Sequence, residues 1–213
     1  MGRFVGRNVL VTGASTGIGR ACAIRFAEEG ANIAINYNRS EGEAKKTAAA
    51  VHKAHELQGY TDADYITVRA DIGHEDQILN MFQSTLNAFG RLDVLINNAG
   101  ILWSSPSHEL PSEDFDRITG VNLRGAYLCC REAIAHFLSR EGGGVIVNNS
   151  SVHEIIPKPT YLSYSISKGG MENLTKSLGL EYADRNIRVN AVGPGAIETP
   201  INAAWIDDAG KRA

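Results

Sequence analysis

The stretch "NVLVTGASTGIGR" (residues 8–20) joins a short apolar run to a turn that contains three glycines. The apolar run is typical of a buried strand, and Gly13, Gly17 and Gly19 occur where that strand must turn into a helix. Glycine in such a turn permits a tight bend, close approach of backbone N–H groups to a pyrophosphate, and close packing of the helix on the sheet. A glycine-rich turn can also form without any ligand. Its position after the first strand of an alternating chain favours nucleotide binding.

The rest of the chain repeats this alternation of strand and helix. Apolar residues recur at helical spacing in the series that begins at Ile78, and again in the series Leu123, Tyr127, Cys130, Ile134 and Phe137. Continuous apolar runs between such helices are typical of strands buried on both faces of a parallel sheet. We therefore predict one α/β domain over residues 1–213, a doubly wound parallel sheet with right-handed crossovers. The further strands are expected at 32–37, 65–68, 92–97, 144–150 and 187–192.

Composition and charge narrow the classes of partner. The chain has 21 basic and 24 acidic residues, a formal charge of −3 and no basic run longer than a pair, which argues against a nucleic-acid partner. No apolar stretch is long enough to span a bilayer, and no export signal is visible. Three cysteines without metal-ligand spacing predict reduced thiols rather than disulfides or a metal site. These features predict a cytoplasmic protein without a membrane partner. His52 and His55 are expected on a solvated helix face.

Tyr164 and Lys168 stand four residues apart in "SYSISKGGM" (163–171) and share one face if this stretch is helical. Such a pair also occurs by chance on ordinary helix surfaces. The second interpretation is that the ammonium changes the acidity of the phenol. A free tyrosine has a pKa of about 10, and a nearby cation lowers that value. Tyr164 would then serve as a general acid or base near neutral pH.

Five motifs occur in the order typical of the short-chain dehydrogenases/reductases, and the chain resembles that family over its whole length. The motifs are TGxxxGIG at 12–19, "NNAG" at 97–100, Ser151, Tyr-x-x-x-Lys at 164–168, and Pro194-Gly195. Stretches such as "SSVHEIIP" (150–157) and "GPGAIETPIN" (193–202) look like the glucose 1-dehydrogenase branch. The resemblance implies a Rossmann-type sheet with strand order 3-2-1-4-5-6.

The resemblance implies a catalytic group of four residues. Tyr164 would be the general acid/base, while Lys168 would hold the nicotinamide ribose and tune the tyrosine. Ser151 would hold the reacting oxygen, and Asn122, in "GVNLRGAYL", would hold a water in a proton relay. Taken alone, Ser151 could equally be a turn cap and Asn122 a kink or cap. The offset of thirteen residues between Ser151 and Tyr164 favours the catalytic role for Ser151.

The resemblance also implies a nicotinamide cofactor, and the second strand bears on which one. A carboxylate at the end of that strand would bond the ribose 2′-OH and repel a 2′-phosphate. Residues 36–39 read Asn-Tyr-Asn-Arg, without an acid, and Arg39 could meet the phosphate. We therefore expect NADP, with NAD also accepted. The residues expected around the cofactor are Gly13, Ser15, Thr16, Gly17, Ile18, Gly19, Tyr37, Arg39, Asp71, Ile72, Asn98, Ala99, Gly100, Tyr164, Lys168, Pro194, Gly195, Ile197 and Thr199.

The glucose 1-dehydrogenase branch implies oxidation of an aldose such as glucose to its lactone. Substrate contacts would come from Ser151, His153, Tyr164 and Asn202. One departure is Leu102, which stands where the branch carries an acid suited to sugar hydroxyls; together with Trp103 it makes that wall apolar. A reductase of 3-oxoacyl thioesters or other carbonyls shares every catalytic residue and stays open as an alternative. A third possible function is that of a non-catalytic regulator that binds a nucleotide.

Two expectations concern assembly and the end of the chain. The family pairs two long helices between subunits, here about 112–140 and 161–183, which predicts a homo-oligomer, namely a tetramer. The sequence stops at "NAAWIDDAGKRA", whereas relatives continue, so we expect the family's C-terminal segment and seventh strand to be missing from this chain. Strand 187–192 would then be a sheet edge bearing Ile187, Val189 and Val192.

Overall fold

The computed structural model describes residues 2–203. The closing residues 204–213, on which the expectation about a missing segment depends, lie outside the described residues. Within the described range, no helix combines the length and the hydropathy needed to cross a membrane.

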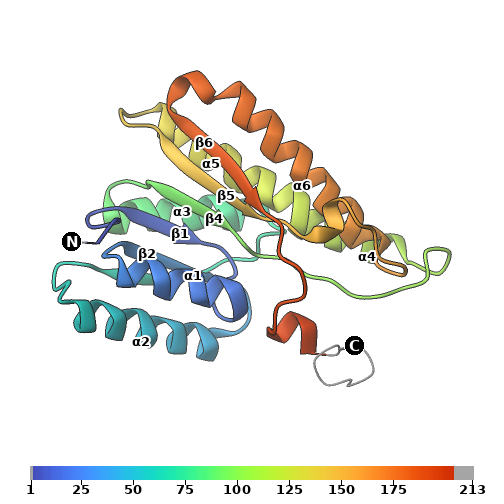
Figure 1. Ribbon diagram of the computed structural model, residues 1–213, viewed down its shortest axis with the longest axis horizontal. Coiled ribbons are helices and arrows are strands. Elements are labelled where there is room, and N and C mark those ends of the chain that lie inside the picture. The colour runs from blue at the N-terminus through green and yellow to red at the C-terminus, as the bar shows by residue number, and fades with distance from the viewer. Residues whose placement is uncertain (1, 204–213) are drawn as a thin grey trace.

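Six parallel strands form one sheet in the order β3-β2-β1-β4-β5-β6, which confirms the predicted doubly wound topology (Figure 1). Val11 at the end of β1 pairs with Ile35 on one side and Ile96 on the other, so the first strand lies at the centre. The apolar runs gave the strand positions to within about two residues. The strands are β1 (Asn8–Val11), β2 (Asn32–Tyr37), β3 (Tyr65–Arg69), β4 (Val94–Asn97), β5 (Gly144–Asn149) and β6 (Ile187–Val192).

Helices cover both faces of the sheet, as the continuous apolar strands require (Figure 1). On β1, Val9 and Val11 pack toward α1 (Gly17–Glu28) and α2 (Glu41–Gln58). Leu10, between them, packs toward the opposite helix layer, because successive side chains alternate along a strand. That layer consists of α3 (Glu75–Phe89), α5 (Ala126–Leu138) and α6 (Leu162–Glu181), and the short α4 (Ser112–Thr119) precedes α5.

Among the described residues, β6 lies at one edge of the sheet, as the sequence predicted for strand 187–192. Ile187 and Val189 are 1% and 7% exposed because they face the helix layer that contains α6. Val192 is 57% exposed. The side chains of an edge strand can thus be covered while its backbone edge is free.

The expectation of solvation is also wrong for His55. This side chain is 3% exposed, and its Nε2 lies 2.9 Å from the carbonyl oxygen of Ala31. Burial lowers the pKa of His55 below its ordinary value. His55 is buried because α2 packs against β2 at this position, although the neighbouring residues of the helix are polar. His52 is exposed, as expected.

The long helix predicted at about 112–140 is interrupted by a π-helical segment, Gly120–Gly125. An extra residue per turn changes which side chains share a face. Within α5, which follows this segment, Tyr127 is 45% exposed while Cys130 and Phe137 are buried, so the predicted stripe is buried only in part. Gly125 lies against Ile72, and a Cβ at Gly125 would overlap the backbone carbonyl oxygen of Ile72.

We predict that Gly125→Ala lowers the free energy of unfolding by about 1–3 kcal/mol, the usual cost of overpacking a rigid site. The matched control is Gly120→Ala in the same segment, where a Cβ would meet nothing within 4 Å. Chemical denaturation of both variants measures the difference. Equal stability of the two variants would contradict the packing described for Gly125.

Candidate active site

A cavity of about 890 Å³ lies where several strands end. Gly13 follows β1, Asn98 follows β4, and Ser151 follows β5, and all three line it. The carboxyl ends of parallel strands meet at one edge of the sheet, which is where ligands bind in such folds. The cavity therefore collects at one place the motifs that the sequence spreads over about 190 residues.

The glycine loop has the conformation that requires glycine. Gly13 and Gly17 have φ values of +61° and +56°, in the left-handed region. A Cβ at Gly13 would lie 2.8 Å from the Cα of Ala99, and one at Gly17 would lie 3.3 Å from Thr199. Gly19 does not line the cavity; a Cβ there would overlap the side chain of Asn98. Two glycines thus shape the cavity wall, and the third permits close packing beneath it.

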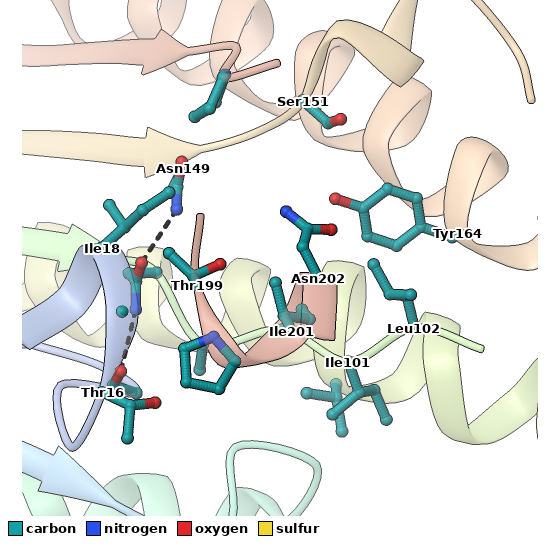
Figure 2. A pocket seen from close by; sticks show the side chains of 18 of the residues that line it. Thr16, Ile18, Ile101, Leu102, Asn149, Ser151, Tyr164, Thr199, Ile201 and Asn202 are labelled. Atoms are coloured by element: carbon teal, nitrogen blue, oxygen red, sulfur yellow. Dashed lines mark hydrogen bonds between the residues drawn. The ribbon is translucent and has the colours of Figure 1, made fainter. Parts of the chain in front are cut away.

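Asn98 holds the loops after β1, β4 and β5 together. Its Nδ2 donates to the carbonyl oxygens of Thr12 and Gly13 at 2.9 and 3.0 Å, and its Oδ1 accepts from Asn149 Nδ2 at 2.9 Å. Figure 2 shows Asn149 turned toward this network from the end of β5. The side-chain amide of Asn98 therefore positions these loops, because both its nitrogen and its oxygen already have protein partners.

At the end of β2 the sequence pointed to the wrong residue. Tyr37 is not part of the cavity wall, whereas Asn36, one position earlier, is. Asn36 Oδ1 accepts from the N–H of Gly13 at 3.0 Å, and Asn36 Nδ2 donates to the carbonyl of Ala70 at 3.1 Å. Alternation along the strand sends the two side chains in opposite directions. The sequence signal for Asn36 as a cavity residue was a polar side chain within a strand of apolar residues.

The far end of the cavity is lined by Arg39 and Asp71. Asp71 Oδ2 accepts from Arg117 at 2.7 Å, and Oδ1 accepts from the N–H of Gly73 at 2.9 Å. Burial by itself would raise the pKa of Asp71, but these hydrogen bonds hold the pKa below its ordinary value. Asp71 is therefore a carboxylate that already has a cationic partner, and Arg117 is a lining residue that the sequence analysis missed.

Ser151 and Tyr164 face the same space. Figure 2 shows both hydroxyls directed toward a common region, with the amide of Asn202 nearby and Leu102 beside the Tyr164 ring. Ser151 Oγ also accepts from the N–H of His153 at 3.1 Å and so caps the short helix η2 (Val152–Glu154). Ser151 thus caps this short helix and also lines the cavity.

Burial raises the pKa of Tyr164 above its ordinary value of 10, although the neighbouring Ser151 hydroxyl acts to lower it. The net direction is upward, so the lowered pKa that the sequence predicted for Tyr164 is wrong for the described residues. The ammonium of Lys168 is 5.7 Å from the centroid of the Tyr164 ring, and its Nζ donates to the carbonyl of Asn149 at 2.7 Å. Desolvation of the phenolate outweighs the cation at that distance.

Lys168 is 3% exposed. Burial lowers the pKa of Lys168 to about 8, and the carboxylate of Glu154 acts in the opposite direction. At neutral pH the side chain of Lys168 is thus a buried cation. Burial opposes its charge, and the carboxylate of Glu154 favours it.

Asn122 lies in the π-helical segment and does not line the cavity. Its Oδ1 accepts from the N–H of Ile101, and its Nδ2 donates to the carbonyl of Ile101, both at 2.8 Å. Nδ2 also donates to Ser167 Oγ at 3.2 Å. Both ends of the side-chain amide therefore have protein partners, so the amide positions the loop after β4. The role of Asn122 in holding a water stays a prediction.

The substrate end combines polar and apolar groups. The His153 ring lies edge-on to Tyr164 with centroids 6.2 Å apart, and its Nδ1 lies 2.8 Å from the carbonyl of Ile156. Asn202 Nδ2 donates to the carbonyl of Ile197 at 2.8 Å. Leu102 and Trp103 form part of the wall, as the sequence predicted. The other expected residues that line the cavity are Ser15, Thr16, Ile18, Ile72, Ala99, Gly100, Pro194, Gly195, Ile197 and Thr199.

Further lining residues were not expected from the sequence. They lie at a strand end, in short 3-10 helices and in loops, and no local sequence pattern marks them. They include Asn38, Ser40, Asn149, Val152, Lys158, Tyr161 and Ile201.

Comparisons with known proteins agree with this geometry. The family described as short chain dehydrogenase matches residues 7–210. Glucose 1-dehydrogenase of Gluconobacter oxydans is 48% identical over 97% of this chain and 75% of its own length. 3beta-hydroxysteroid dehydrogenase 1 of Eggerthella lenta is 46% identical over 98% of this chain and 77% of its own.

A solved structure of a short chain dehydrogenase from Burkholderia cenocepacia, in complex with NADP, superimposes with a TM-score of 0.88. It is 33% identical, and the alignment covers 99% of this chain and 81% of that one. The motif order, the sheet and these relatives lead to one conclusion: the chain belongs to the short-chain dehydrogenase family.

Proposed function

We propose that the protein is an NADP-preferring oxidoreductase that interconverts a hydroxyl and a carbonyl, with an aldose as the favoured substrate. The observation that carries the proposal is the convergence of the Ser151 and Tyr164 hydroxyls on one space, with the buried Lys168 beside them. A phenol, a second hydroxyl and a cation around one reacting oxygen are what acid–base chemistry on an alcohol or carbonyl requires.

The described residues fit a dinucleotide. The left-handed Gly13 and Gly17 turn the end of β1 into the N-terminus of α1, as phosphate binding at a helix N-terminus requires. Lys168 Nζ uses one of its three donors on the Asn149 carbonyl. When bound, a nicotinamide cofactor supplies the hydride acceptor or donor.

Tyr164 moves the proton at the reacting oxygen. Its raised pKa keeps the phenol protonated at neutral pH, so Tyr164 can donate a proton to a carbonyl oxygen in reduction. In oxidation the same group accepts the hydroxyl proton, and the Lys168 ammonium stabilises the phenolate that this requires. Ser151 donates a hydrogen bond to the reacting oxygen and so stabilises the charge that develops there.

The aldose proposal rests on two supports. The glucose 1-dehydrogenase relative from Gluconobacter oxydans aligns along nearly the whole chain. The polar groups His153 and Asn202 lie at the substrate end of the cavity. A second candidate is a more apolar secondary alcohol or ketone, favoured by Leu102 and Trp103 in the wall and by the hydroxysteroid dehydrogenase relative.

The cofactor proposal rests on the end of β2. Arg39 is exposed at the cavity mouth, and the lining residues after β2 are Asn38, Arg39 and Ser40, without a carboxylate. A guanidinium with hydroxyl and amide neighbours is suited to a 2′-phosphate. NADP and NAD binding are both compatible with this arrangement.

Assembly as a homotetramer stays a prediction. On the two helices that would pair between subunits, Tyr127 of α5 and Ile166 of α6 are each 45% exposed. Leu174 and Leu178 of α6 are both partly buried, and Leu178 packs against the core of its own subunit. The exposed Tyr127 and Ile166 support the proposal, whereas Leu178 belongs to the core.

We expect Tyr164→Phe to lower kcat by about 10²–10⁴-fold, the usual contribution of a general acid or base. NADP affinity should change little, because the lost hydroxyl acts on the substrate proton. Steady-state kinetics and a cofactor titration of the same preparation test this. Substantial turnover by Tyr164→Phe would contradict the role of Tyr164 as the general acid or base.

For cofactor choice, we expect a higher kcat/KM with NADP than with NAD. Arg39→Gln should reduce this preference by about tenfold through loss of a charged hydrogen bond of about 1.5 kcal/mol. Kinetics with NAD on the same variant provide the control, since the 2′-hydroxyl needs no cation. A strong NAD preference in the unmodified protein would show that the end of β2 has been misinterpreted.

A further inference from the structure

The charges around the cavity are not balanced. Among the described residues that line it, one is a carboxylate, Asp71, and four are cations: Arg39, Arg117, Lys158 and Lys168. Arg117 pairs with Asp71, Lys168 is buried beside Tyr164, and Arg39 lies where the proposed function puts the 2′-phosphate. Lys158 therefore remains as the lining cation to which the proposed chemistry gives no role.

Lys158 stands close to the catalytic tyrosine along the chain and in space. Its Nζ lies 4.4 Å from the centroid of the Tyr161 ring, which is a cation–π contact. Tyr161 immediately precedes α6, its carbonyl accepts from Ser165 at 2.9 Å, and Tyr164 follows within the same first turn. No carboxylate of residues 2–203 lies within ion-pair distance of Lys158.

A strained residue fixes this wall of the cavity. Thr160 has φ +68°, a left-handed conformation that is unusual for a β-branched residue and costs about 1–3 kcal/mol. Its carbonyl accepts from the N–H of Ser105 at 2.8 Å, and its hydroxyl accepts from Ser104 Oγ at 2.6 Å. Thr160 thereby holds the segment with Lys158 and Tyr161 against the segment that carries Leu102 and Trp103.

We propose that Lys158 and Tyr161 form a subsite for an oxyanion of the substrate, a carboxylate or a phosphate remote from the reacting carbon. The carbon skeleton of the substrate then lies along Leu102 and Trp103, with its reacting oxygen at Ser151 and Tyr164. The inference rests on the proposed hydroxyl–carbonyl chemistry and adds a charge requirement to it. A neutral sugar would leave Lys158 without a partner, whereas an anionic substrate supplies one.

Binding of two matched, unreactive ligands tests the subsite independently of turnover. Cyclohexanecarboxylate and cyclohexanecarboxamide differ in charge but hardly in shape, and ligand-observed NMR gives the Kd of each. We expect the unmodified protein to bind the carboxylate about fivefold more tightly, near the upper limit for an exposed ion pair. Lys158→Gln should abolish this difference. Lys53→Gln, which removes an exposed lysine from α2 outside the cavity wall, should leave it intact.

Two outcomes overturn the subsite: equal affinity for both ligands in the unmodified protein, or a carboxylate preference that survives in Lys158→Gln. Kinetics with two further pairs identify the anion. Glucose is compared with glucose 6-phosphate, and cyclohexanol with 4-hydroxycyclohexanecarboxylate. For each pair, the kcat/KM of the charged compound is divided by that of the neutral compound. In the pair that carries the natural anion, Lys158→Gln should lower this ratio about fivefold. A binding preference without turnover of any compound would instead count against the proposed function.

Discussion

The close approach of Gly13 to the backbone of Ala99 sets the geometry of the whole cavity. A Cβ at Gly13 would lie 2.8 Å from the Cα of Ala99, so another residue there would push the ends of β1 and β4 apart. Thr12 Oγ1 uses this proximity and accepts from the N–H groups of Asn98 and Ala99 at 2.9 and 3.0 Å. The turn after β1 and the turn after β4 therefore form a single unit, and the cofactor loop depends on both.

A second set of buried amides connects that unit to the catalytic helix. Asn97 Nδ2 donates to Asn148 Oδ1 at 3.0 Å, and Asn148 Nδ2 donates to Thr175 Oγ1 of α6 at 2.9 Å. These hydrogen bonds between buried side chains fix α6 against β4 and β5. Tyr164 and Lys168 thus take their positions from a helix that is held along its length and not only at its first turn.

The fold was predictable from the sequence because its signals are local. Apolar runs gave each strand, and glycines that require left-handed backbone marked the turn after β1. The site was less predictable where it depends on packing. Asn36 and Tyr37 are adjacent in sequence, and only the direction of strand alternation decides which of them reaches the cavity. The role of Asn122 as a support for Ile101, and the π-helical segment that holds it, depend on a partner about twenty residues away.

The protonation states of Tyr164 and Lys168 were the least predictable, because they depend on burial. Spacing alone suggested a lowered pKa for the phenol, but burial raises the pKa of Tyr164 and lowers that of Lys168 to about 8. Lys168 is then charged below pH 8 and neutral above it, while Tyr164 stays protonated across this range. The pH dependence of kcat/KM for carbonyl reduction tests this account most directly. A level profile from pH 6 to about 8 that falls at higher pH is the expected result. A rate of reduction that rises steadily with pH would contradict it.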